Sequence, residues 1–165
     1  MPKGTMDFAA FRLTDDERRQ LLLVQTECTV GWLNSDGWPV SAFLTYLFER
    51  DAFWVTSFRD RPRVDCLVAD PRSTVAVSSA GKDIAHGRMI SARTLAVVHD
   101  VASTAEWFYP QFGRMAGLDP KVSARQDRVA IELRPQAWNS FDAKRMLRRE
   151  FTSRAPRPSS DPSPP

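Results

Sequence analysis

Three arginines, Arg59, Arg61 and Arg63, stand at alternate positions in the segment TSFRDRPRVDC. Guanidinium groups this close together repel one another, so they must be solvated or balanced by anions. Two hydroxyl residues, Thr56 and Ser57, come directly before them, at the end of a strand-like run. Hydroxyl and guanidinium groups are the donors that suit a phosphate monoester, whose charged oxygens accept several hydrogen bonds. The pattern therefore predicts an anion site of the kind that holds a phosphate group.

The start of a predicted helix lies in the same place. Residues 60–70 are typical of a short helix, with Asp60 as a candidate N-cap and Pro62 in the first turn. The free N–H groups and the positive end of the helix dipole at such a start also favour an anion. The alternative is that Asp60 and Asp65 balance the arginines in surface salt bridges, which is what exposed arginines commonly do.

Six runs rich in β-branched and aromatic residues are predicted strands. They cover residues 28–34, 39–49, 52–57, 73–79, 87–99 and 128–135. Short polar turns join the first three runs, and Pro135 is expected to end the last. Helices are predicted at 14–25, at 60–70, from 103 onward and at about 140–150. Two of them open with capping boxes, Thr14 with Glu17 and Ser103 with Glu106.

Strands joined by short connections, with helices inserted rather than alternating, favour a mainly β (α+β) antiparallel barrel over a parallel α/β sheet. The length of 165 residues suits one domain. We expect residues 1–13 to be an N-terminal arm and residues 14–150 to be the barrel domain. Residues 151–165 are rich in proline and polar side chains, can bury little apolar surface, and are expected to be a disordered tail.

The order of these features resembles a known family. The segments that carry the resemblance are DGWPVSAFLTYLF, FWVTSFRDRPRVDCLVADPRSTVAV and RVAIELRPQAWNSFD. They are similar to the FMN-binding split β-barrel proteins related to pyridoxamine 5′-phosphate oxidase. The resemblance covers most of residues 14–142 and implies a six-stranded antiparallel split β-barrel with peripheral helices.

The resemblance also implies where a cofactor binds. Carried over by position, the ligands of the flavin phosphate are Thr56, Ser57, Arg61 and Arg63. The flavin ring is expected along the stretch from Ser41 to Thr45, and Arg88 is expected near the pyrimidine end of the ring. Two positions depart from the family pattern, because Arg63 stands where lysine is usual and Cys66 where asparagine is usual.

The resemblance implies a homodimeric oxidoreductase that binds FMN and transfers hydride to or from a small organic substrate. The chain lacks the C-terminal Arg-x-Trp motif of true pyridoxamine 5′-phosphate oxidases, so oxidation of vitamin B6 is not expected. One alternative is the deazaflavin-using branch of the family, because the arginine loop also suits a longer acidic coenzyme. Another is a non-catalytic flavin- or haem-binding protein, for which His86 or His99 would matter.

No residue stands out as a catalytic acid, base or nucleophile. His86 and His99 lack partners at metal-ligand spacing, and no GxSxG motif is present, so neither a metal site nor a hydrolase is predicted. This fits flavin chemistry, in which the cofactor carries the reaction.

Charge and hydropathy restrict partners and location. The net charge of +3 comes from residues 142–165, and residues 1–141 are balanced, which does not favour nucleic-acid binding. No apolar run is long enough to span a bilayer. The start of the chain lacks the apolar segment of a signal peptide, so we expect a cytoplasmic protein. Cys28 and Cys66 are expected to be buried thiols.

Overall fold

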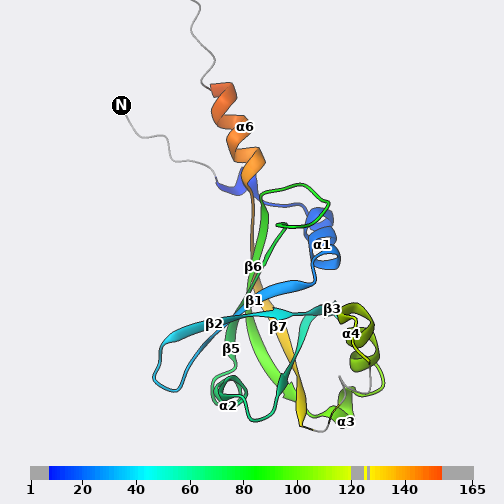
Figure 1. Ribbon diagram of the computed structural model, residues 1–165. Helices are drawn as coiled ribbons and strands as arrows, with labels where there is room; N and C mark the ends of the chain where they lie inside the picture. Colours follow the sequence, from blue (N-terminus) through cyan, green and yellow to red (C-terminus); the bar gives the residue numbers. More distant parts are fainter. Residues whose placement is uncertain (1–7, 120–124, 126, 154–165) are drawn as a thin grey trace, which may run out of the picture.

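The computed structural model describes residues 8–119, 125 and 127–153. All of its strand pairs are antiparallel (Figure 1). The strands are β1 (Glu27–Leu33), β2 (Pro39–Thr45), β3 (Leu47–Glu49), β4 (Ala52–Phe58), β5 (Arg72–Ser78), β6 (Arg88–His99) and β7 (Arg128–Asp142). The helices are the 3-10 turn η1 (Phe8–Phe11), α1 (Asp15–Val24), α2 (Pro62–Ala69), α3 (Val101–Thr104), α4 (Phe108–Ala116) and α6 (Ala143–Ser153).

The strands form one sheet in the order β2-β1-β5-β6-β7-β4-β3. Its two outermost strands, β2 and β3, are consecutive in the sequence and are separated only by Tyr46. The sheet therefore curls until both ends meet at one bent segment. The prediction of a mainly β antiparallel split barrel with peripheral helices is confirmed. The count of six strands is wrong, because the predicted strand 39–49 breaks at Tyr46 into two strands with different neighbours, β1 and β4.

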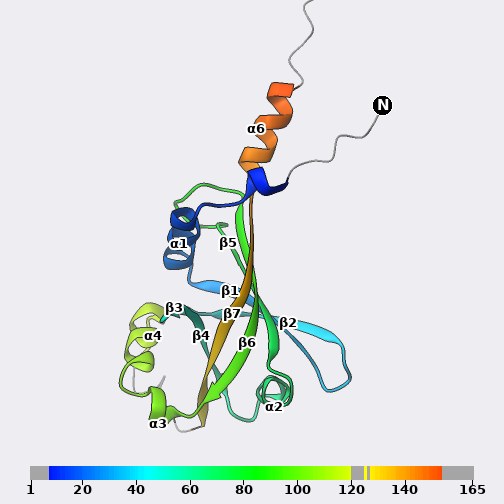
Figure 2. The same cartoon turned by 180° about the vertical axis from the view of Figure 1, so that it is seen from behind.

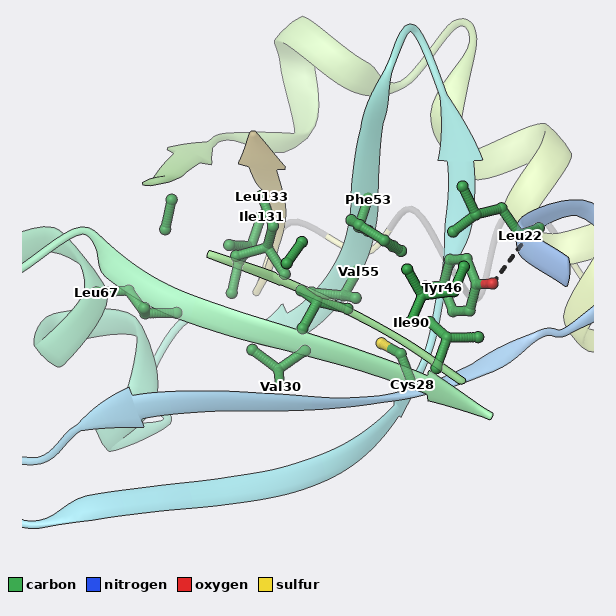
Figure 3. Close-up of a cluster of buried hydrophobic side chains, with 14 of the residues drawn as sticks. Leu22, Cys28, Val30, Tyr46, Phe53, Val55, Leu67, Ile90, Ile131 and Leu133 are labelled. Carbon is green, nitrogen blue, oxygen red and sulfur yellow. Dashed lines mark hydrogen bonds between the residues drawn. The ribbon is translucent and has the colours of Figure 1, made fainter. Parts of the chain in front are cut away.

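Two groups of buried side chains lie on opposite faces of the sheet. The main core fills the inside of the curl and includes Val30, Val55 and Ile131 (Figure 3). A second group, on the other face, joins Trp54 of β4 to Phe108 and other aromatic side chains of α4. The aromatic residues Phe108, Tyr109 and Phe112 of α4 are therefore part of the core. Because alternate residues of β4 enter the two groups, this strand is buried on both faces.

Helix α1 begins as predicted. Thr14 is the N-cap, its Oγ1 accepts from the N–H of Glu17, and the Glu17 carboxylate accepts from the N–H of Thr14. The second predicted capping box is wrong. Asp100 instead caps the short helix α3 by accepting from the N–H of Ser103 at 3.0 Å, so that helix starts three residues earlier and Glu106 lies after its end.

Strand β7 continues past Pro135, so the prediction that Pro135 ends it is wrong. Pairing with β4 stops at Leu133, and beyond this point one edge of β7 has no described strand beside it. On the other edge the register with β6 shifts at Arg93 and Thr94, which leaves Gln136 without a partner. A bulge of this kind, beside an open edge, accommodates the missing N–H of proline.

Helix α6 extends away from one end of the barrel in both Figure 1 and Figure 2. It starts at Ala143 and runs through Ser153, so the first residues of the predicted tail are helical. The rest of that tail, residues 154–165, lies outside the described residues. Within the expected N-terminal arm, Phe11 of η1 is buried against Phe141. No helix in the described part of the chain has both the length and the apolar character needed to cross a membrane.

Candidate functional site

The predicted arginine loop lies at one end of the barrel, where β4 ends and α2 begins (Figure 2). The backbone N–H of Arg59 donates to the carbonyl of Asp127 at 2.8 Å, which fastens the loop to the chain just before β7. An open hollow of ≈ 670 Å³ adjoins the loop, and it is lined by Phe58, Arg59, Asp60, Arg61, Pro62 and Asp127. We call this loop and the hollow beside it the arginine corner.

Thr56 and Ser57 point to opposite faces of β4, because successive side chains of a strand alternate. Thr56 shares its face with Trp54, and its Oγ1 donates to the carbonyl of Val129 at 3.0 Å. Ser57 is 4% exposed, and its Oγ has no hydrogen-bond partner among the described residues. A buried hydroxyl without a partner is costly unless a ligand or water completes it. Of the two predicted hydroxyl ligands, only Ser57 has an unused hydroxyl.

The three arginines of the corner form no salt bridge with the carboxylates that the structure describes. In the described residues, no carboxylate oxygen lies within 4.0 Å of a guanidinium nitrogen of Arg59, Arg61 or Arg63. The alternative in which Asp60 and Asp65 pair with them is therefore wrong for this structure. Burial lowers the pKa of the Arg63 guanidinium, and the charge of Arg61 lowers it further. Within the described residues, the corner therefore carries positive charge that no salt bridge neutralises.

Helix α2 opens into this corner without a side-chain cap. The N-cap is Arg61 rather than the predicted Asp60, and the side chain of Arg61 makes no capping hydrogen bond. Pro62 follows in the first turn. The first-turn N–H groups therefore have no side-chain acceptor within the described part of the chain, and they add to the positive character of the corner.

The predicted position of the flavin ring is on β2, an outermost strand of the sheet. Ser41 is exposed and Thr45 is half-buried, and they pair with Gly31 and Glu27 of β1. No described strand pairs with the other edge of β2. Its backbone groups are therefore open to a ligand or to a second chain.

Arg88 lies away from the arginine corner. It is the first residue of the 12-residue strand β6. The other end of β6 lies level with Thr56, because His99 of β6 and Thr56 of β4 both pair with Ala130 of β7. The Arg88 guanidinium donates to Glu17 at 2.7 Å and lies 3.4 Å from Asp142. The structure therefore does not bring Arg88 together with the other predicted ligands, and its charge is already paired.

Sequence reasoning did not select Tyr109 of α4, which packs on β4, or Arg128 of β7, which pairs with Phe58 at the start of the corner. The described residues contain three buried side-chain atoms without a hydrogen-bond partner, namely Ser57 Oγ, Tyr109 Oη and Arg128 Nε. Arg128 pairs with Phe58 across β4 and β7, directly after the pair that contains Ser57. These residues meet only through tertiary pairing, so no local pattern marks them.

The two histidines are placed differently. His86 is exposed, whereas His99 Nε2 lies 2.9 Å from Glu132 Oε2 and its ring faces Trp54 at 5.2 Å. Burial raises the pKa of Glu132, but hydrogen bonds from Arg134 and His99 outweigh this and hold it below its usual value. In the part of the chain that the structure describes, no group of three or more His, Cys, Asp and Glu side chains could hold a metal ion.

Comparison with known proteins relates this geometry to other barrels. No family model matches the chain, and no curated protein sequence matches it. Solved structures do match. An F420 reductase is 19% identical, with a TM-score of 0.62 over 73% of this chain and 94% of that protein. A putative pyridoxamine 5′-phosphate oxidase from Listeria innocua is 16% identical, with a TM-score of 0.60 over 76% of this chain and 95% of that protein.

HutZ, a haem storage protein from Vibrio cholerae, shares the fold as well. It is 12% identical, with a TM-score of 0.58 over 79% of this chain and 97% of that protein. The fold of the chain is therefore that of the split β-barrel proteins to which pyridoxamine 5′-phosphate oxidase-like proteins belong. At these identities the likeness concerns the fold, and the function must be argued from the site.

Proposed function

We propose that the chain binds a flavin-type coenzyme, FMN or a deazaflavin, and acts as an oxidoreductase on a small organic substrate. The shared fold supports this proposal, since similar barrels include an F420 reductase and a putative pyridoxamine 5′-phosphate oxidase. The observation that carries it is the arginine corner. The donors there have no anionic partner among the described residues, which suits the phosphorylated end of such a coenzyme.

The residues present fit a phosphate group. In our proposal Arg61 and Arg63 bind its charged oxygens, the start of α2 adds backbone N–H groups, and the hydroxyl of Ser57 gains the partner that it lacks. Every one of these groups is a donor or a cation. Thr56 has a different task, because its hydroxyl holds β4 to β7 through Val129.

The coenzyme, when bound, supplies the electron and hydride chemistry. The chain would bind and orient it: the arginine corner would hold the phosphate, and the backbone of β2 between Ser41 and Thr45 would bind the ring. We assign no catalytic acid or base. In this proposal the substrate is a small organic molecule.

We also propose that the protein is a homodimer. Trp38 and Phe43, on the β1–β2 ribbon, are 70% and 83% exposed. Large apolar side chains gathered on one exposed ribbon are typical of an association surface. A second copy of the chain would cover them, and analytical ultracentrifugation measures the resulting mass.

The phosphate site is tested by titrating the apo protein with FMN and following flavin fluorescence. Arg61→Ala and Arg63→Ala should each weaken binding by about 1.5–3 kcal/mol, the contribution of a hydrogen bond to a charged group. Arg72→Ala is the matched control, because Arg72 is an exposed arginine already paired with Asp70 at 2.6 Å. Unchanged FMN affinity in both corner variants, with a normal fold, would reject the assignment.

The two coenzymes are separated by the same titration. Purified protein that is yellow, or that binds FMN and not a deazaflavin, supports FMN. Colourless protein that binds only the deazaflavin supports the other branch. Loss of deazaflavin binding in Arg63→Ala would show that the same corner serves either coenzyme.

A haem-binding role is the second candidate, and the placement of His99 favours it. The buried carboxylate of Glu132 orients the His99 ring through Nε2, as carboxylates hydrogen-bonded to metal-binding histidines orient those rings. Added haem should then give a Soret band that His99→Ala abolishes and that His86→Ala, a change of the exposed histidine, leaves intact. A band that survives His99→Ala would exclude this role for the residue.

A further inference from the structure

Strand β4 has a second set of unused donors on the face opposite Ser57. Helix α4 packs on this face and brings Tyr109 beside Thr56. Tyr109 is fully buried, yet its Oη makes no hydrogen bond of normal geometry with any described residue. The other buried tyrosine, Tyr46, shows the usual arrangement, in which Oη donates to the carbonyl of Leu22 at 3.0 Å (Figure 3).

Arg128 lies on the same face, because it pairs with Phe58, two residues after Thr56 on β4. Burial raises the pKa of Tyr109, which keeps the phenol protonated at neutral pH, while Thr56 and the charges of Arg128 and Arg59 oppose this in part. The Nε of Arg128 is buried without a partner, and its guanidinium lies over the ring of Phe58 at 4.4 Å. Neither arginine forms a salt bridge with a described carboxylate.

The nearby carboxylates are already engaged. Asp127 pairs with Arg125 at 2.9 Å. Asp100 accepts the N–H of Ser103, and this bond, more than the charge of Arg59, lowers its pKa. The cluster therefore contains a phenol O–H, a guanidinium N–H and a second guanidinium. The acceptor beside the phenol is the neutral hydroxyl of Thr56, and no described carboxylate forms a salt bridge with either arginine. An anion is the ligand that completes such a set of donors.

We propose that Tyr109, Arg59 and Arg128 form a second oxyanion-binding site, on the Thr56 face of β4, that takes the carboxylate or phosphate group of a small organic anion. Arg59 also lines the ≈ 670 Å³ hollow, so its exposed side chain connects this site to the arginine corner. The second site does not require the coenzyme, and if the proposed function holds, the anion is the substrate.

The test begins with the stability of the ligand-free protein. Tyr109→Phe removes a hydroxyl whose neighbour, Thr56, is not placed for a hydrogen bond of normal geometry, so the thermal midpoint should change little or rise. Tyr46→Phe removes a hydroxyl that donates to a carbonyl, so the midpoint should fall. A fall in Tyr109→Phe as large as that in Tyr46→Phe would show that Tyr109 serves the fold, and it would overturn the proposal.

Anion binding is then measured by calorimetry with inorganic phosphate and with benzoate as probes, at constant ionic strength. All proteins carry Arg63→Gln, which weakens the arginine corner. Adding Tyr109→Phe or Arg128→Gln should weaken binding of at least one probe about tenfold or more. Arg125→Gln is the control, since Arg125 is 61% exposed and paired with Asp127.

The two probes decide which anion the site prefers. Binding of phosphate alone assigns a phosphate-bearing ligand, and binding of benzoate assigns a carboxylate. If the Arg63→Gln protein binds phosphate and benzoate with the same affinities whether or not it also carries Tyr109→Phe or Arg128→Gln, the proposed site is overturned. Failure of this anion site would not reject the proposed coenzyme site, because that site is tested separately by FMN titration of the Arg61→Ala and Arg63→Ala variants.

Discussion

Glu17 joins three elements through one carboxylate. Its Oε1 accepts from Arg88 of β6 at 2.7 Å and from Arg145 of α6 at 2.6 Å, and its Oε2 accepts from the N–H of Thr14 at 2.9 Å. The resemblance places Arg88 beside the flavin ring, so the strength of this network decides whether Arg88 is free for a ligand. We predict that Glu17→Gln lowers the free energy of unfolding by about 2–3 kcal/mol.

The magnitude follows from what glutamine keeps and what it loses. Its side-chain oxygen still accepts from Thr14, so most of the capping contribution survives. The Arg88 side chain is 13% exposed, and a hydrogen bond between charged groups there contributes about 1.5–3 kcal/mol. The Arg145 side chain is 35% exposed, so solvent reduces that pair to roughly 1 kcal/mol or less. Asp142 still faces Arg88, which keeps the cost below that of breaking an isolated buried pair.

The assay is urea denaturation followed by circular dichroism. For a chain of this length the loss corresponds to a fall of roughly 5–10 °C in the thermal midpoint. Asp15→Asn is the control, because the Asp15 side chain is 90% exposed and its pair with Arg18 should contribute less than about 1 kcal/mol. If Glu17→Gln costs no more than Asp15→Asn, the network does not hold Arg88, and our account of this arginine is refuted.

The dependence on pH has a definite sign. Burial raises the pKa of Glu17, but hydrogen bonds from Thr14 and Arg145 and the charges of Arg88 and Arg145 outweigh it and hold the pKa below the usual 4.5. A carboxyl with a lowered pKa stabilises the fold above its unfolded value and loses this contribution as the pH falls through the folded value. The difference between wild type and Glu17→Gln should therefore shrink as the pH falls below about 4.5.

Two further predictions concern the barrel itself. Gly31→Ala would place a methyl carbon 2.6 Å from Thr74 Oγ1, so it should destabilise the protein by about 1–3 kcal/mol in thermal unfolding. Adding Thr74→Ala to this variant should restore much of the lost stability. No recovery in the double variant would contradict the contact. Burial raises the pKa of Cys28 to about 12, so its thiol should not react with iodoacetamide at pH 8 in the native protein, whereas the half-exposed Cys66 should be labelled. Mass spectrometry measures the labelling of each cysteine. Equal labelling would contradict the placement of Cys28.

Local rules account for the parts of the fold that the sequence predicted. The capping box of Thr14 and Glu17 depends on two residues three positions apart, and the structure contains it. The turn at Arg50 and Asp51 depends on a short polar break between two strands. The structure contains this turn as well, with positive φ at both residues. The errors arise where contacts distant in sequence compete with local preference. Pro135 stays within β7 because a bulge in its pairing with β6 accommodates it.

The sequence by itself determined that arginines and hydroxyls gather between a strand and a helix, because their order along the chain fixes them within a few residues. It also determined the alternation that puts Thr56 and Ser57 on opposite faces. Only the tertiary structure decided which hydroxyl is unused, since the partner of Thr56 is a carbonyl of β7, far away in sequence. It likewise brought Tyr109 and Arg128 to the same strand. Pairing between distant strands chooses such neighbours, and a one-dimensional pattern does not contain that choice.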